Sequence, residues 1–266
     1  MKNLLPAVLI AILSASLFTS CKKDKGEPPV LPPAESMTID FSNFATAAKS
    51  AVSFSDIKGV NQENWQFSAV VAGIWNSILT TTLIVPVTAF KLAADQDPVY
   101  LSDKTWQWSY NSTVSGVAYQ VRLVGQISSS VTWKLYLSTG TSNEFLWIEG
   151  TSNLDGKSGT WTINKSVTAP EAFLQIDWAK TDDSVASVKY TYIKTSEEFT
   201  GSYIEYGLQT GSYDAFYVVH YFDGAEFSDV NIEWNRTTHN GRVKSPSHFG
   251  DSQWHCWDTN LINVTC

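Results

Sequence analysis

Apolar and polar side chains alternate with a period of two through most of the chain from Thr105 onwards. This is the pattern of strands that turn one face to a core and the other to solvent. Clusters of Gly, Asn, Asp and Ser separate the alternating runs and are typical of turns. The pattern predicts about ten strands with no helix between them, an antiparallel meander. The expected core-facing positions are Trp106, Trp108, Tyr110, Val121, Leu123, Trp133, Leu135, Trp161, Ile163, Ile176, Trp178, Val188, Tyr190, Ile232 and Trp234.

A different period precedes the strands. Residues 64–90 contain no charged side chain, and their apolar positions follow helical spacing. We expect a core helix over 65–84 and, with Pro86 in its first turn, a second short helix to about Ala94. A membrane span over 67–90 is the alternative, which the polar residues inside the run disfavour. The predicted core-facing side of the helix is Val71, Ile74, Trp75, Ile78, Leu79 and Leu83.

These elements predict a mainly β domain over residues 36–266, with a helical part at about 65–94 and a short first strand at 37–41. A sheet with one apolar face needs a cover, and the helix is the candidate. We therefore expect a curled sheet or half-barrel around the N-terminal helices. A closed up-and-down barrel is the alternative, because closure would remove the sheet's exposed edges.

The first twenty residues have the layout of a secretory signal: Lys2, an apolar run, then small residues before Cys21. Phe18-Thr19-Ser20-Cys21 resembles the lipobox of bacterial lipoproteins, with Phe18 where Leu is usual. The resemblance implies cleavage before Cys21 and lipidation of that cysteine. Two or three acyl chains would anchor the protein stably to a membrane.

Residues 21–35 are polar and rich in proline, which predicts an extended tether between the anchor and the domain. Lys22 rather than Asp follows the cysteine, which by resemblance favours the outer membrane. Whether the domain faces the periplasm or the cell surface stays open. The mature domain resembles half-barrel envelope lipoproteins that carry lipid cargo, at the level of architecture alone.

The amino-acid composition narrows the classes of partner that the protein can bind. Removing residues 1–20 takes away Lys2 alone, so the formal net charge goes from −8 to −9. An acidic chain is a poor partner for nucleic acid, whose phosphates require a basic surface. With Cys21 lipidated, Cys256 and Cys266 remain in an oxidising compartment, and we expect them to form a disulfide. The oligomeric state is left open.

The chain carries no strong catalytic signature. It has no G-x-S-x-G turn, and His239, His248 and His255 lack the spacing of a zinc site. Carboxylates on strands fit a solvated sheet face. We therefore expect neither a metal nor a cofactor, and an enzyme is the less favoured class. Asp183-Ser184-Val185 resembles a bacterial O-glycosylation acceptor, a three-residue match.

The remaining signal is an excess of aromatic residues, 11 Trp, 11 Tyr and 13 Phe. Two hypotheses follow. The leading one is a non-enzymatic binding or structural module with an apolar groove for an amphiphile. The other is a surface lipoprotein that binds or processes carbohydrate, because aromatic rings beside carboxylates can stack on sugars. Candidate ligand-binding residues are Trp147, Tyr203 and Phe216.

Overall fold

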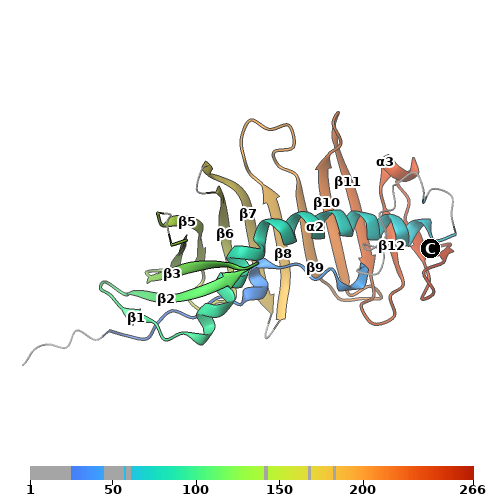
Figure 1. The fold of residues 1–266 in the computed structure, drawn as a ribbon. Helices are drawn as coiled ribbons and strands as arrows, with labels where there is room; N and C mark the ends of the chain where they lie inside the picture. Colours follow the sequence, from blue (N-terminus) through green and yellow to red (C-terminus); the bar gives the residue numbers. More distant parts are fainter. Residues whose placement is uncertain (1–24, 45–56, 58–60, 141–142, 167–168, 182–183) are drawn as a thin grey trace, which may run out of the picture.

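The computed structural model describes residues 25–44, 57, 61–140, 143–166, 169–181 and 184–266. Cys21 and the signal segment lie outside the described residues. The described residues form one sheet of fourteen antiparallel strands that follow one another in sequence order (Figure 1). The strands are β1 Val99–Tyr100, β2 Thr105–Val114, β3 Val117–Ile127, β4 Val131–Ser138, β5 Phe145–Ser152, β6 Ser158–Ser166, β7 Ala169–Thr181, β8 Ser184–Tyr192, β9 Tyr203–Leu208, β10 Ala215–Phe222, β11 Phe227–Trp234, β12 Gly241–Lys244, β13 His255–Trp257 and β14 Asn263–Val264.

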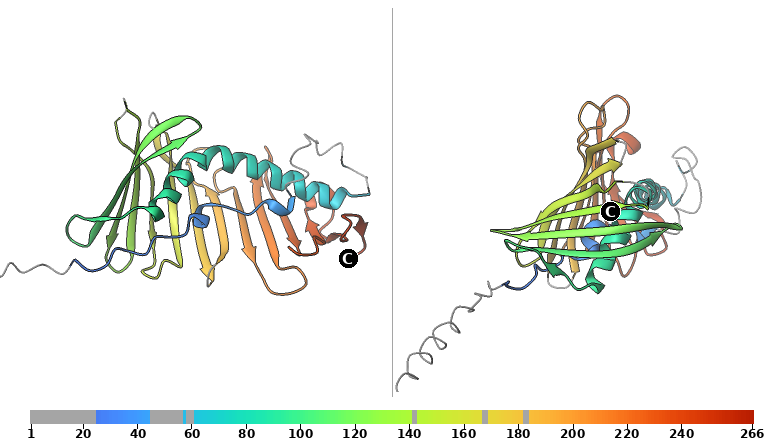
Figure 2. Two further views of the ribbon diagram at one scale, coloured as in Figure 1. Left: turned by 60° about the horizontal axis from the view of Figure 1, so that its bottom comes forward. Right: turned by 60° about the vertical axis from the view of Figure 1, so that its left-hand side comes forward.

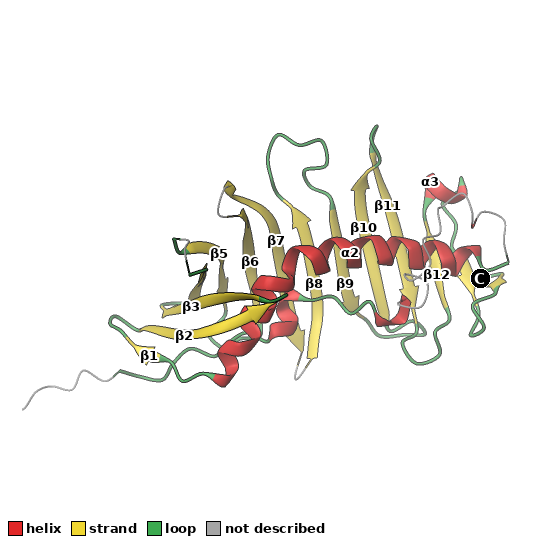
Figure 3. Ribbon diagram, viewed as in Figure 1, coloured by secondary structure: helices red, strands yellow, loops and turns green. Residues whose placement is uncertain are grey.

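The sheet is curled but does not close. Each strand pairs with its neighbours in sequence, and β1 and β14 lie at opposite ends of the molecule (Figure 3). The predicted meander is confirmed, and the closed barrel is not the fold. Both edge strands are two residues long, which leaves few unpaired backbone groups exposed to another chain.

One face of the sheet carries the core. The predicted alternation is confirmed in β4, where Val131, Trp133, Leu135 and Leu137 are buried. Large rings on this face lie over glycines of the adjacent strand: Trp133 over Gly125, Trp161 over Gly150 and Trp257 over Gly241. A strand glycine leaves the space that an indole needs to lie flat on the sheet. Of the eleven tryptophans, eight are buried in the core.

The helix α2, Glu63–Lys91, lies lengthwise across this face (Figure 2). Its length and mean hydropathy of 1.7 would also suit a membrane span. Here it packs on the sheet, as expected for a core helix. Its buried residues include small side chains, which allow close approach. They are Asn64, Trp65, Phe67, Ser68, Ala69, Val71, Ala72, Leu79, Leu83, Pro86, Ala89 and Phe90.

Two details of the helix prediction are wrong. Helix α2 continues through Pro86 to Lys91 and is followed by the 3-10 turn η3, Leu92–Asp95, so the expected break is absent. Packing of buried Ala89 and Phe90 offsets the missing proline donor. In addition, Ile74 and Ile78, which were predicted to face the core, are 46% and 51% exposed. The sheet covers only part of the apolar surface of α2.

Residues 28–44 form an N-terminal strap that runs beside α2 along the same face (Figure 2). It contains the 3-10 turns η1, Ala34–Met37, and η2, Ser42–Phe44, so the predicted strand at 37–41 is wrong. Buried Ser36 accepts a hydrogen bond from Trp161 Nε1 at 3.0 Å. Pro29 and Pro32 are also buried, so the residues predicted as a free tether to 35 are docked on the domain from Pro28 onwards.

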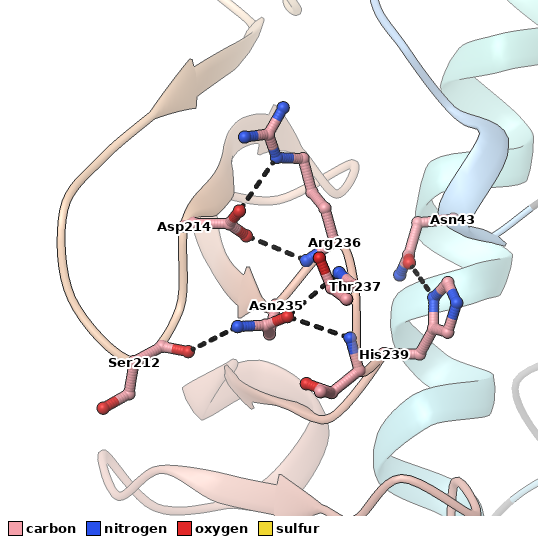
Figure 4. A network of polar contacts seen from close by, with 8 residues as sticks. Asn43, Ser212, Asp214, Asn235, Arg236, Thr237 and His239 are labelled. Carbon is pink, nitrogen blue, oxygen red and sulfur yellow. Dashed lines mark hydrogen bonds and ion pairs between the residues drawn. The ribbon is translucent and has the colours of Figure 1, made fainter.

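The end of the strap is held by both packing and polar contacts. Phe44 is 1% exposed and contacts the rings of Tyr217, Trp234 and Trp257. Asn43 pairs with His239 in the turn after β11 (Figure 4). The strap therefore closes the core over the later strands.

Side chains order the turns near the end of the strap, between β9 and β10 and between β11 and β12 (Figure 4). Asn235 Oδ1 accepts the backbone N–H groups of Thr237 and Thr238. Asp214 accepts the backbone N–H and the Nε–H of Arg236. Partial burial would raise the pKa of Asp214, but these bonds outweigh it and hold the pKa below its usual range. The network is structural in character.

Cys256 and Cys266 form a disulfide, as predicted, with Cα atoms 5.2 Å apart. It joins β13 to the end of the chain after β14. Asn64 Nδ2 in the first turn of α2 donates to the Cys256 carbonyl at 2.7 Å. The C-terminal strands and the start of the helix therefore support each other.

Candidate functional site

An apolar groove of about 460 Å³ lies between α2, the end of β10 and the short helix α3, Pro246–Phe249. This volume is within the usual range of small-molecule sites. The residues that line it are Phe67, Val71, Ile74, Trp75, Ile78, Val219, Tyr221, Asp223, Ser247 and His248.

The groove wall comes from a row of α2 in which Phe67 and Val71 are buried and Ile74 and Ile78 are exposed. Phe67, Val71, Ile74 and Ile78 are three or four residues apart and so form one row along the helix. This row lies beside the buried row that contacts the sheet. Because both rows are apolar, the hydrophobic surface of α2 is wider than one sheet face can cover.

The floor comes from the sheet. Val219 on β10 is 2% exposed and belongs to the alternating core positions of that strand. Tyr221, two residues further, points to the same face and is half-buried. Phe67 stacks on His248 of α3, with ring centroids 4.0 Å apart, which holds α3 against the helix.

Polar groups gather at one end of the groove. Tyr221 Oη lies 3.4 Å from Ser247 Oγ, and Asp223 follows β10 in the turn towards β11. His248 Nε2 lies 3.1 Å from Glu63 Oε1, and both side chains are largely buried. The site is therefore an apolar trough with a polar, acidic end.

A second, smaller hollow of about 220 Å³ lies on the other side of α2, beside the strap. Leu83, Ile84 and Val87 contribute its helical wall, and Ile39 of the strap faces them. Tyr190 lies at its base, and burial raises the pKa of its phenol. The Tyr190 hydroxyl has no hydrogen-bond partner among the described residues, and its oxygen is closed to solvent.

The aromatic residues predicted to bind ligand are not brought together. Trp147 lies on β5, separated from Tyr203 on β9 by the three strands β6 to β8, and contacts Phe145. Tyr203 and Phe216 lie on adjacent strands, on the face opposite the core, but their partners across the pair are His220 and Gly207. The groove contains none of the three.

Tyr203 belongs to a stack that crosses four strands. Lys189 Nζ lies 3.8 Å from the centre of its ring on one side, and His220 stacks on it at 5.3 Å. His220 stacks in turn on Phe227 at 4.6 Å and pairs with Asp229. Both faces of the Tyr203 ring are therefore occupied by protein. Phe216 instead lies over Gly207, as the tryptophans do on the other face.

The histidines near the end of the chain pair with single carboxylates rather than with one another. His255 pairs with Asp251 at 3.0 Å, and His248 pairs with Glu63. Within the part of the chain that the structure describes, no group of three His, Cys, Asp or Glu side chains is placed to hold a metal ion.

Comparison of the chain with protein-family models, curated proteins and solved structures gives no significant match. No residue role is therefore carried over from a relative.

The sequence pattern contained a signal for the groove that the prediction did not use. The prediction assigned Val71, Ile74, Trp75, Ile78, Leu79 and Leu83 to one core-facing side. Phe67, Val71, Ile74 and Ile78, however, are displaced around the helix from Ala72, Leu79 and Leu83. A second apolar row of this kind indicates either a second packing partner or an exposed binding surface. The residues of α3 and β10 came from distant parts of the chain and gave no such signal.

Proposed function

We propose that this protein is a non-enzymatic binding module of the cell envelope, which holds the apolar chain of an amphiphile in the groove beside α2. The observation that carries the proposal is the groove itself. Ile74 and Ile78 are exposed along its wall on α2, and polar side chains lie at one end. Exposed apolar surface beside a concave site is typical of binding sites.

The anchor fits this role. We propose that Cys21 is lipidated and holds the protein at the outer membrane. The domain would then work next to a bilayer, where amphiphiles are abundant. Because the strap is docked from Pro28 onwards, the tether between Cys21 and the domain would be shorter than the predicted one, which extended to residue 35.

The test is calorimetric titration with dodecyl maltoside below its micelle concentration. The protein would be secreted behind a cleavable signal that leaves no lipidated cysteine. Ile78→Asp places a charge in the groove wall, and we expect at least a tenfold loss of affinity, because the bound alkyl chain would desolvate the new carboxylate. Ile78 is half exposed, so the fold should tolerate the change.

The matched control is Ile84→Asp. Ile84 is 44% exposed on the same helix but borders the smaller hollow rather than the groove. It should bind dodecyl maltoside like the unsubstituted protein. Absence of any binding would refute the proposed function, and loss of binding in Ile84→Asp alone would move the site to the other side of α2.

A further inference from the structure

The polar end of the groove has a definite sign of charge. Among the described residues that line the groove, Asp223 is the one that is formally charged, and none is Lys or Arg. The backbone N–H groups of Glu226 and Ala225 bind the Asp223 carboxylate and hold its pKa below the usual range. Asp223 is therefore negative at neutral pH.

His248 does not reverse this sign. Its Nε2 lies 3.1 Å from Glu63 Oε1, so a protonated His248 is balanced by the Glu63 carboxylate. The other polar groups at this end, the hydroxyls of Tyr221 and Ser247, carry no charge at neutral pH. Among the described residues that line the groove, Asp223 thus supplies a negative charge that no lysine or arginine balances.

From this arrangement we infer that the groove selects amphiphiles with a cationic head, an amine or a quaternary ammonium, over those with a carboxylate. The inference rests on the proposed function, since it concerns the head of the same ligand. With the chain along Val71, Ile74 and Ile78, the head reaches the end where Asp223, Ser247 and His248 lie. The aromatic ring of Tyr221 at that end also suits an ammonium group.

The expected effect is moderate because Asp223 is exposed. One charge about 5 Å from another in a water-like medium changes affinity by about fourfold, and more where solvent is partly excluded. A cationic and an anionic head differ by twice that interaction. We therefore expect dodecyltrimethylammonium to bind at least about tenfold more tightly than dodecanoate.

The test titrates both probes, below their micelle concentrations, into the same secreted protein and into Asp223→Asn. Asparagine retains the oxygen that accepts the turn N–H groups, so the turn should persist. The preference for the cation should fall by about tenfold, because that preference is assigned to the Asp223 charge. Asp155→Asn is the matched control, because Asp155 also accepts a turn N–H, from Lys157, but lies between β5 and β6, far from the groove.

The outcomes separate the two proposals. Dodecanoate binding as tightly as the cation, or an equal change in Asp223→Asn and Asp155→Asn, would overturn the head-group inference while the apolar groove stands. If dodecyl maltoside and both ionic probes fail to bind, the proposed function itself fails. A preference lost in Asp223→Asn alone would support both.

Discussion

At the scale of single residues, the core is set by pairs of glycine and tryptophan on neighbouring strands. Trp161 covers Gly150, and the carbonyl oxygen of Thr160 lies on the same side. An indole lying flat buries more area against the sheet than one standing upright among its neighbours. These glycines are therefore packing residues rather than turn residues.

We predict that Gly150→Ala destabilises the domain by about 1–3 kcal/mol, because the added methyl would overlap with Thr160 and Trp161 and both would have to shift. Urea unfolding followed by tryptophan fluorescence measures the change. Gly140→Ala is the control, since a methyl there meets nothing within 4 Å. Equal stability of the two variants would show that the ring does not need the glycine.

At the scale of elements, α2 has two apolar rows that lie in different surroundings. One row is covered by the sheet, and the other forms the groove wall. The strap covers part of the remaining core face, although its sequence suggested a strand and a free tether. Whether an apolar row is covered depends on which distant segment lies beside it, and local pattern carries no information about that.

The C-terminal strands depend on the disulfide. The Cys256–Cys266 bond closes a short loop around the two-residue strand β14. We predict that Cys266→Ser lowers stability by about 2–3 kcal/mol, the loop-closure entropy of a chain segment of this length. Thermal unfolding with and without reductant is the measurement. Reductant should lower the Tm of the unsubstituted protein and leave that of the variant nearly unchanged; an equal response of the two would contradict the prediction.

At the scale of the whole molecule, the domain is an open sheet with one face closed by a helix and a strap and the other face exposed. On the exposed face, charged and aromatic side chains contact one another, as Lys189 does the ring of Tyr203. The groove and the smaller hollow lie on the covered face, on either side of α2. The side of the molecule that carries the helix is therefore where we expect a ligand.

The anchor also belongs to this scale. We predict that Cys21→Ser abolishes incorporation of an alkyne-tagged palmitate analogue in the host and leaves the chain uncleaved before residue 21. In-gel fluorescence and intact mass report the two effects. Cys266→Ser should label normally, because its cysteine is not in the lipobox. Labelling that persists in Cys21→Ser would exclude the lipobox assignment.

The sequence by itself determined the strand-rich class, the core-facing positions of the strands, the presence of the helix and the disulfide pair. Each of these follows from local periodicity or from cysteine count, which the chain carries without its fold. Tertiary structure alone decided that the sheet stays open, that α2 runs unbroken through Pro86 and that the strap is docked. It also decided that Ile74 and Ile78 face a groove, because Val219, Tyr221 and His248 reach it from more than 130 residues away along the chain.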